Sequence, residues 1–455
     1  MQRIEIENFG AIKNAKIDIK KVLILIGEQA SGKSTIAKLI YFFKSLREDL
    51  ISNIRENTDS KFEVEFYHLI IEKFSDFFGS SFLLQESRIT YFYNYKNNKN
   101  ITLFVKDEKL KLNFSKNFFS NEFIKSQLEI KEVLKEIRNE TSFWRKIFSG
   151  ESGLNQRLLS LVNDVFEIYH NNSLYVVAGR MATVGYSELL QRYFFAETES
   201  RISENRRKRI ASIDETLMIE FMQRVLEIKS ELKLESIVSE TISMENSDSK
   251  KSILGLTEKM RPILRADYNY KNDEEFIQIQ NNQIIQLRHA SSGQQEVIRI
   301  LQDIFFVLEE RGTKIFRIIE EPEAHLFPIA QKQLIELMAL MVNQSPDNQL
   351  IITTHSPYVL TSFNNLLYAH KTAERHVDSA QEVTQVISQD FWLDTTAFSA
   401  YAIGNTFDIQ AGYCEDIYDE KTGLIQQNYL DTVSEMLGIE FQKLYRINAK
   451  NLSKK

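Results

Sequence analysis

The sequence predicts an α/β fold with a parallel core sheet, accompanied by an antiparallel β-meander, a helical insertion and a small α+β C-terminal cap. The first observation is the apolar run 22–26, which leads through a glycine-rich loop into a segment with apolar residues at helical spacing. The second is the alternation of helix-like and strand-like segments after residue 293, which is typical of parallel α/β sheets. The third is the position of the five prolines, which all lie at or after Pro262 and so favour long helices before it.

The composition is that of an ordinary soluble globular protein. The 455 residues are 43% hydrophobic and 26% charged, and this length suits two or three folding units. A formal net charge of −7 excludes a polycation, so contact with nucleic acid would require a local basic patch. The single cysteine, Cys414, excludes an internal disulfide and fits a reducing compartment. The sequence has neither a signal-peptide pattern nor a membrane-spanning apolar run, so we expect a cytoplasmic protein that does not associate with membranes.

The N-terminal part is expected to contain strands, one helix and the meander. Residues 2–8 alternate polar and apolar side chains and predict a strand, and a second strand follows at 11–26. The spacing of apolar residues predicts a helix over 35–47. Residues 87–119 contain aromatic and β-branched runs broken by two polar turn signals, which predicts a β-meander.

The rest of the chain is expected to be helical first and then α/β. Amphipathic helices are predicted at 121–139, 155–169 and 214–239. A buried strand is predicted at 174–179 and a polar loop at 240–251. Two turn signals divide strand-like stretches within 263–287, and the alternation then continues as helix 293–311, strand 314–319, helix 328–343 and strand 349–353. The tail is expected to form a hairpin through 419–423 and a helix near 428–445. We therefore predict a split head (1–119, 173–180 and 255–395), an insertion (120–254) and a cap (396–455).

A complete phosphate-binding loop follows the apolar run 22–26. The segment Gly27-Glu28-Gln29-Ala30-Ser31-Gly32-Lys33-Ser34-Thr35 matches the P-loop pattern G-x-x-x-x-G-K-[ST] between a strand and a helix. Its glycines let backbone N–H groups turn toward phosphates, and the helix start adds the positive end of its dipole. Lys33 is expected to contact the β- and γ-phosphates, Ser34 to ligate Mg²⁺ and Thr35 to reach the α-phosphate. The expected nucleotide-binding residues here are Gly27, Ala30, Ser31, Gly32, Lys33, Ser34 and Thr35.

Two later strands end in residues that suit nucleotide hydrolysis. The strand 314–319 delivers Glu320 and Glu321 to the carboxyl edge of the sheet, beside the P-loop. Glu320 is expected to hold Mg²⁺ through water and Glu321 to polarise the attacking water, with a solvated acidic turn as the alternative. The strand 349–353 delivers His355, which can bond the γ-phosphate and position the water. A purely structural histidine is the alternative there.

A fourth motif, Ser291-Ser292-Gly293-Gln294-Gln295, precedes a predicted helix. A hydroxyl and free N–H groups at a helix start form an anion site, and the same groups serve as an N-cap. Both roles are therefore open for Ser291, Ser292 and Gly293. Together with the other three motifs, this segment completes a set of four in a fixed order along the chain.

The four motifs together resemble those of the ABC-type ATPase heads of chromosome-maintenance and recombination-repair proteins. They are more similar to the shorter AAA-type ABC ATPases of bacterial anti-phage systems, which include the overcoming-lysogenization-defect family and the ATPase subunits of PARIS and Septu systems. The likeness covers about 1–47, 173–180 and 260–360, and it is carried most specifically by 291–296 and 320–326. It implies an ABC-type P-loop NTPase head, ATP and Mg²⁺ as ligands, and a homodimer in which Ser291 and Gly293 touch the γ-phosphate of the opposite protomer.

Three departures from that pattern are present. Ser292 stands where related ATPases have glycine, and Glu320 stands where many have aspartate. No glutamine follows the strand 174–179, and Arg180 lies there instead, in an Ala-x-Arg arrangement similar to that of the defence ATPases. Arg180 is expected either to sense the γ-phosphate or to form a plain ion pair.

The sequence also narrows the biological role. No Cys-x-x-Cys pattern is present for a zinc hook, and the 258 residues from Lys33 to Ser291 (291 − 33) are too few for very long coiled-coil arms. The 100 residues after His355 (455 − 355) contain no clear acidic nuclease cluster, so we expect the effector on another polypeptide. A basic run is the candidate for contacting DNA or an acidic partner, with a solvated surface as the alternative; it consists of Arg206, Arg207, Lys208 and Arg209.

We therefore predict an ATP-hydrolysing dimeric switch that couples its nucleotide state to a separate effector, in anti-phage defence. One alternative is a scaffold that holds an effector with negligible turnover, which Ser292 and Glu320 permit. Another is a DNA repair or chromosome-maintenance ATPase, which the short arms and the acidic charge disfavour. A transporter subunit is disfavoured by the large insertion, and GTP specificity by the lack of an Asn-Lys-x-Asp motif.

Overall fold

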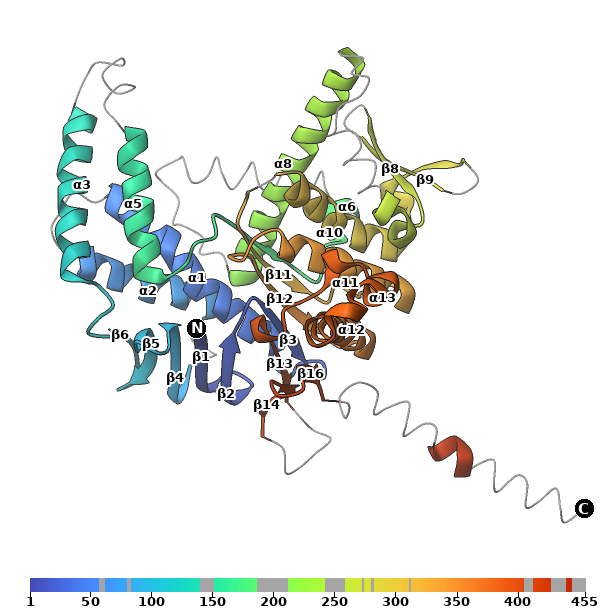
Figure 1. The fold of residues 1–455 in the computed structure, drawn as a ribbon. Coiled ribbons are helices and arrows are strands. Elements are labelled where there is room, and N and C mark those ends of the chain that lie inside the picture. Colours follow the sequence, from blue (N-terminus) through green and yellow to red (C-terminus); the bar gives the residue numbers. More distant parts are fainter. Residues whose placement is uncertain are drawn as a thin grey trace, which may run out of the picture.

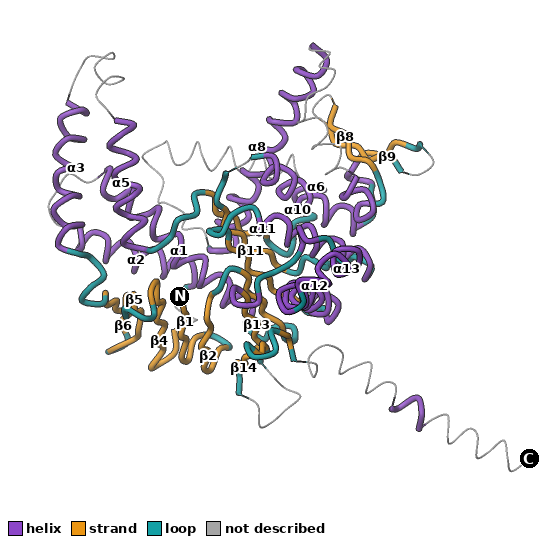
Figure 2. The backbone as a smooth tube through the Cα atoms, viewed as in Figure 1, coloured by secondary structure: helices purple, strands orange, loops and turns teal. Residues whose placement is uncertain are grey.

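A mixed six-stranded sheet forms the centre of the molecule (Figures 1 and 2). Its order is β14 (Cys414–Asp416), β13 (Phe398–Ile403), β3 (Val22–Ile26), β12 (Gln349–Thr354), β11 (Ile315–Glu320) and β7 (Asn172–Val176). The strands β13, β3, β12, β11 and β7 are parallel, and β14 is an antiparallel edge strand. The predicted α/β class with a parallel core sheet is confirmed. The computed structural model describes residues 1–56, 62–79, 83–139, 151–185, 212–241, 258–271, 274–279, 282–310, 312–404, 412–426 and 439–443.

The predicted β-meander is part of a second, antiparallel sheet. This sheet has the order β2 (Ile12–Ile19), β1 (Gln2–Phe9), β4 (Leu83–Asn94), β5 (Lys99–Lys106) and β6 (Lys109–Phe114). The prediction of one strand over 11–26 is wrong, because the chain turns at Lys20 and Lys21 and enters the core sheet as β3. The first half of this segment, β2, pairs with β1, and the second half, β3, pairs with β12 and β13.

The helix α1 (Lys33–Glu56) lies between the two sheets and is longer than predicted. On one side the ring of Tyr41 stacks on Phe316 of β11, with 6.3 Å between ring centroids. On the other side Phe43 stacks on Tyr91 of β4 at 5.1 Å. The helix α2 (Phe62–Phe78) closes this layer, because its Phe74 contacts Phe42 of α1 edge to face. Aromatic packing therefore fixes the P-loop helix rigidly between the sheets.

The opposite face of the core sheet is covered by helices (Figure 1). These are α10 (Ser292–Glu309), α11 (Pro328–Asn343) and α12 (Pro357–Arg375), with α13 (Ala380–Val386) beside α12. Side chains on a strand alternate between faces. On β11, Phe316 accordingly faces α1, whereas Arg317 pairs with Asp303 of α10.

The insertion contributes helices that project from this body (Figure 1). The helices α3 (Asn121–Asn139) and α5 (Glu151–Phe166) form an antiparallel pair, and α8 (Ile213–Thr241) projects separately. The short α6 (Ala182–Gly185) follows β7. The basic run 206–209 and most of the predicted loop 240–251 lie outside the described residues.

Two smaller sheets complete the structure. The region 263–287 forms β8 (Asp267–Lys271), β9 (Glu274–Gln278) and β10 (Ile284–Gln286), and residues 272–273 and 281 of the two predicted turns lie outside the described residues. The tail hairpin consists of β15 (Tyr418–Asp419) and β16 (Leu424–Ile425). One boundary needs correction: β13, assigned from the sequence to the cap, lies in the core sheet beside β3. Of the predicted helix 428–445, only 439–443 is described, and it is helical.

None of the helices in the described ranges is long and apolar enough to cross a membrane.

A buried ionic cluster joins the core sheet to two helices. Arg317 is fully buried and donates from Nε to Asp303 at 2.6 Å. Asp303 also accepts from Arg224 of α8 at 3.3 Å. Both partners are out of contact with water, so removing one charge leaves the other uncompensated.

The substitution Asp303→Asn is therefore expected to lower the free energy of unfolding by about 3–5 kcal/mol, because Arg317 keeps its charge in the core. Urea unfolding measures the change. The control is Glu129→Gln, which removes an exposed pair with Arg157 and should cost less than about 1 kcal/mol. Equal effects of the two substitutions would show that the buried cluster has no special weight.

Candidate nucleotide site

Three strand ends meet at one edge of the core sheet. In the parallel register, Ile26 of β3 pairs with Thr354 of β12, and Glu320 of β11 pairs with Thr353. The loops that follow these strands carry the P-loop, His355 and Glu321. The carboxyl edge of a parallel sheet is where open α/β folds bind ligands. The structure thus brings three of the four sequence motifs together.

The P-loop has the tight backbone that its glycines allow. Gly32 has φ +95°, and Ala30 lies in the left-handed region with φ 60°. A Cβ atom on Gly27 would lie 2.2 Å from the carbonyl oxygen of Ile403, so no larger residue fits there. The helix α1 starts at Lys33, and its first turn is bonded from Ile36 N to Gly32 O at 2.9 Å.

The Lys33 side chain lies inside this loop. Its ammonium donates to the carbonyl oxygens of Gly27 at 2.9 Å and Glu28 at 2.7 Å, and to Ser31 Oγ at 3.4 Å. Burial lowers its pKa to about 8, although the carboxylates of Glu321, Glu323 and Glu320 act in the opposite direction. The lysine is therefore placed where P-loop lysines meet phosphates, in an environment that disfavours its charge.

His355 links Lys33 to Glu321. The Nδ1 atom of His355 lies 3.5 Å from Lys33 Nζ, and its Nε2 atom lies 2.8 Å from Glu321 Oε1. An ammonium can only donate, so Nδ1 accepts, and Nε2 carries the proton that it donates to the carboxylate. The side chains of His355 and Glu321 are 34% and 38% exposed, so water reaches both. Glu321 has φ 43°, a strained conformation of the kind that functional sites retain.

Glu320 lies deeper than Glu321. It is 6% exposed, and its two oxygens accept from Tyr175 Oη at 2.7 Å and from Ala178 N at 3.1 Å. Each oxygen keeps a further lone pair, so the carboxylate can still bond a metal-bound water. Together with the Ser34 hydroxyl at the start of α1, this gives a set of oxygen donors. Such a set fits Mg²⁺, which keeps several waters when bound to proteins.

Glu323 is a residue to which sequence analysis assigned no step. Its Oε1 accepts from Thr354 Oγ1 at 2.6 Å and from His355 N at 2.8 Å. These bonds hold the loop after β11 against the loop after β12 and so fix the Glu321–His355 distance. In the sequence, only the spacing of Glu323 from Glu321 pointed to this role, because the residues that Glu323 bonds lie about thirty positions away.

Arg180 has a different place from the one expected of a phosphate sensor. It is fully buried and donates to the carbonyl oxygens of Glu320 at 2.9 Å, Glu321 at 3.0 Å and Glu296 at 3.0 Å. It also pairs with the Glu296 carboxylate at 3.2 Å. Of the two roles considered, the structure contains the ion pair. The guanidinium therefore connects α10 to the backbone of Glu320 and Glu321.

The signature segment (residues 291–295) forms the start of α10. Ser291 is its N-cap and forms a capping box with Gln294. Gly293 packs closely on the loop after β11, because a Cβ there would lie 2.6 Å from His325 O. Among the described residues, no hydrogen bond joins 291–293 to the P-loop, and both serines are exposed. The capping role is present, and the hydroxyls remain accessible.

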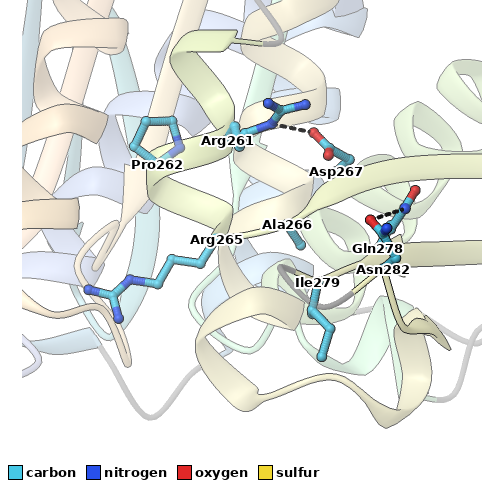
Figure 3. A pocket seen from close by; sticks show the side chains of 8 residues that line it. All are labelled: Arg261, Pro262, Arg265, Ala266, Asp267, Gln278, Ile279 and Asn282. Carbon is cyan, nitrogen blue, oxygen red and sulfur yellow. Dashed lines mark hydrogen bonds and ion pairs between the residues drawn. The ribbon is translucent and has the colours of Figure 1, made fainter.

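Figure 3 shows a surface pocket, and one hydrogen bond links its wall to the signature segment. Gln294 Nε2 donates to Leu264 O at 3.0 Å, and Leu264 ends the helical stretch that forms one wall. The pocket is lined by Arg261, Pro262, Arg265, Ala266, Asp267, Gln278, Ile279 and Asn282. Arg261 pairs with Asp267 at 2.6 Å, whereas Arg265 points away from this pair. No residue of the four motifs lines it, so it is separate from the nucleotide site.

Most of the chain matches one protein family. The model of the AAA ATPase domain family matches residues 1–360, a range that contains all four motifs. The chain belongs to the AAA ATPase domain family. The resemblance stated from the motifs is therefore confirmed for the ATPase domain.

The matches of this AAA ATPase to individual proteins either cover a small part of the chain or have low sequence identity. A stretch of 159 residues is 28% identical to endonuclease GajA of Bacillus cereus (strain HuB5-5). The match covers 30% of the chain and 23% of GajA, so the chain spans under a quarter of that relative. Solved structures with low similarity include the SMC head bound to the C-winged helix domain of ScpA (TM-score 0.36, 13% identity, 79% of this chain and 90% of that chain). Another is the SMC head domain from Thermotoga maritima (TM-score 0.33, 10% identity, 79% and 90%).

The pKa of Lys33 yields a prediction for nucleotide binding. Phosphates stabilise the ammonium, so ATP–Mg²⁺ binding at pH 8 should take up about half a proton, and affinity should fall as the pH rises through 8. Calorimetry in buffers of different ionisation enthalpy measures this uptake. It should vanish near pH 6.5, where Lys33 is already charged. The control Lys33→Arg is always charged and should take up none. A wild-type enthalpy at pH 8 that does not depend on the buffer would contradict the prediction.

Proposed function

We propose that this protein is a dimeric switch that binds and hydrolyses ATP and couples its nucleotide state to a separately encoded effector in anti-phage defence. The observation that carries the proposal is the hydrogen-bonded chain Lys33–His355–Glu321 at one edge of the parallel sheet. It aligns a phosphate-binding cation with a solvent-accessible carboxylate, as hydrolysis of a nucleoside triphosphate requires.

Each residue has a distinct part in the proposed reaction. The P-loop N–H groups and Lys33 bind the triphosphate, and Thr35 reaches the α-phosphate. Glu321 accepts a hydrogen bond from the attacking water. His355 orients the Glu321 carboxylate and would lie next to the γ-phosphate of bound ATP. Mg²⁺, held by Ser34 and through water by Glu320, would neutralise phosphate charge.

The signature segment supports a site shared between two copies. Ser291, Ser292 and Gly293 lie at the exposed N-terminus of α10, where hydroxyl and N–H groups can bind an anion. Their hydrogen bonds do not reach the P-loop of the same chain. We infer that they bind the triphosphate held by a second copy, so that ATP closes a homodimer. The capping box and phosphate binding are compatible, because the Ser291 hydroxyl can accept one bond and donate another.

Contacts of α8 support coupling between the nucleotide and the projecting helices. On α1, Tyr41 donates to Glu220 of α8 at 2.6 Å. On α10, Asp303 accepts from Arg224 of α8 at 3.3 Å. The helix α8 therefore contacts both α1, which begins in the P-loop, and α10, which begins in the signature segment. A change in their relative position on dimer closure would move α8, which projects from the body (Figure 1), and this movement would reach a partner bound to α8.

The defence role and the partner rest on similarity. The motif phrases resemble defence ATPases, and part of the chain is similar to endonuclease GajA. An effector nuclease or toxin is the partner that this likeness suggests. DNA contact through Arg206, Arg207, Lys208 and Arg209 is a further proposal, and their placement lies outside the described residues. Salt-sensitive binding and DNA-stimulated hydrolysis would favour that role.

The substitution Glu321→Gln tests the switch. Loss of the carboxylate should lower phosphate release by about 100-fold or more, because the attacking water is no longer polarised. ATP binding should persist, so the variant should gain mass with ATP–Mg²⁺ in light scattering and hold it longer than the wild type.

The control is Glu336→Gln, a partly buried carboxylate of α11 that pairs with Lys332 and belongs to none of the four motifs, which should leave both readouts unchanged. Unchanged phosphate release from Glu321→Gln would contradict the catalytic assignment. Tight ATP binding with negligible release from the wild type would instead favour the scaffold function.

A further inference from the structure

The C-terminal part of the chain lies against the outside of the P-loop. The strand β13 runs parallel to β3, and Ala402 pairs with Ile26, the residue before Gly27. Beyond the strand, a Cβ on Gly404 would lie 2.7 Å from Ser31 Cβ, so the two backbones approach as closely as glycine permits. The strand end therefore packs directly on the loop that would hold the phosphates.

Tyr413 adds a specific bond to this contact. Its hydroxyl donates to the carbonyl oxygen of Ser31, which is 382 positions away in the sequence. Its own backbone carbonyl accepts from Gly404 N at 2.7 Å, which fixes the tyrosine to the end of β13. A Cβ on Gly32 would lie 2.8 Å from the Tyr413 hydroxyl. The phenol is thus seated against the peptide that joins Ser31 and Gly32.

The direction of that peptide matters for phosphate binding. In a trans peptide the C=O and N–H groups point in opposite directions. A hydroxyl that holds the Ser31 carbonyl on the outer side therefore turns the Gly32 N–H toward the inner side of the loop. Inward N–H groups are what a P-loop uses to bind phosphates. Gly32 also has φ +95°, a conformation that needs support because glycine is flexible.

We propose that Tyr413 is a positioning residue of the nucleotide site, which holds the P-loop in its phosphate-binding shape through the Ser31 carbonyl. This inference rests on the proposed binding of ATP. It makes the C-terminal segment an integral part of the site, although the P-loop stands near the other end of the sequence.

The state of the phenol suits this role. Burial raises the pKa of Tyr413 to about 12, so the hydroxyl stays protonated and able to donate across the working range of pH. The contact with Ser31 is therefore insensitive to pH, in contrast to the charge of Lys33.

The test compares Tyr413→Phe with Tyr418→Phe. Each substitution removes one hydroxyl that donates to a backbone carbonyl, but the Tyr418 hydroxyl bonds Thr395, away from the P-loop, at 2.7 Å. Dissociation constants for ATP, ADP and adenosine are measured by calorimetry, together with thermal midpoints and kcat and KM for phosphate release. Loss of one hydrogen bond should weaken ATP and ADP binding about 2- to 10-fold in Tyr413→Phe. Any adenosine affinity and kcat should stay unchanged, because only phosphate binding is affected.

The outcomes separate this inference from the proposed function. If the wild-type protein binds no ATP, the proposed function is wrong, and the inference about Tyr413 is wrong with it. Wild-type binding with an unchanged Tyr413→Phe constant would overturn the inference alone. Equal weakening in Tyr418→Phe, with equal thermal shifts, would also overturn it, because the effect would then be one of general stability.

Discussion

The parallel register of β3, β12 and β11 is the constraint on which the rest of the structure depends. It places Ile26, Thr354 and Glu320 at one edge, so that the loops after them converge. A slip of one residue would move Glu320 to the other face of the sheet, away from Tyr175. Aromatic packing of α1 between the two sheets and the buried Arg317–Asp303 pair hold this register from both faces. The site is therefore built on a closely packed part of the core sheet, as precise positioning of reacting groups requires.

Arg180 extends this rigidity from the sheet to the signature helix. Its guanidinium bonds four backbone carbonyls. Two belong to Glu320 and Glu321, one to Glu296 of α10, and one to Val177, which follows β7. Gly293 makes the same connection by packing on His325 O. In this account, a force on the exposed N-terminus of α10 reaches the backbone of Glu321 without passing through a flexible loop. The helix α8 is bonded to α10 through Arg224 and to α1 through Glu220, so it connects these two helices.

Sequence reasoning succeeded where the signal is local. The glycine spacing of the P-loop, the polar residues after each apolar strand and the cap at Ser291 all depend on neighbours within a few positions. It failed where partners are distant: nothing near Tyr413 indicates that its hydroxyl bonds Ser31. The break between β2 and β3 was missed because both halves are apolar enough for strands, and only their pairing separates them. Arg180 was ambiguous for the same reason, since its burial depends on α10.

The central claim is that one nucleotide is held by two copies of the chain, and mixing two inactive variants tests it most directly. Lys33→Ala removes the cis lysine, and Ser291→Arg blocks the signature segment. Mixed dimers contain one intact site, with Lys33 from one copy and residues 291–293 from the other. We predict that phosphate release, lost in each variant alone, returns in the mixture. A chain with both substitutions, mixed with Lys33→Ala, should recover nothing. Mixtures that stay inactive although their dimers form would contradict a shared site.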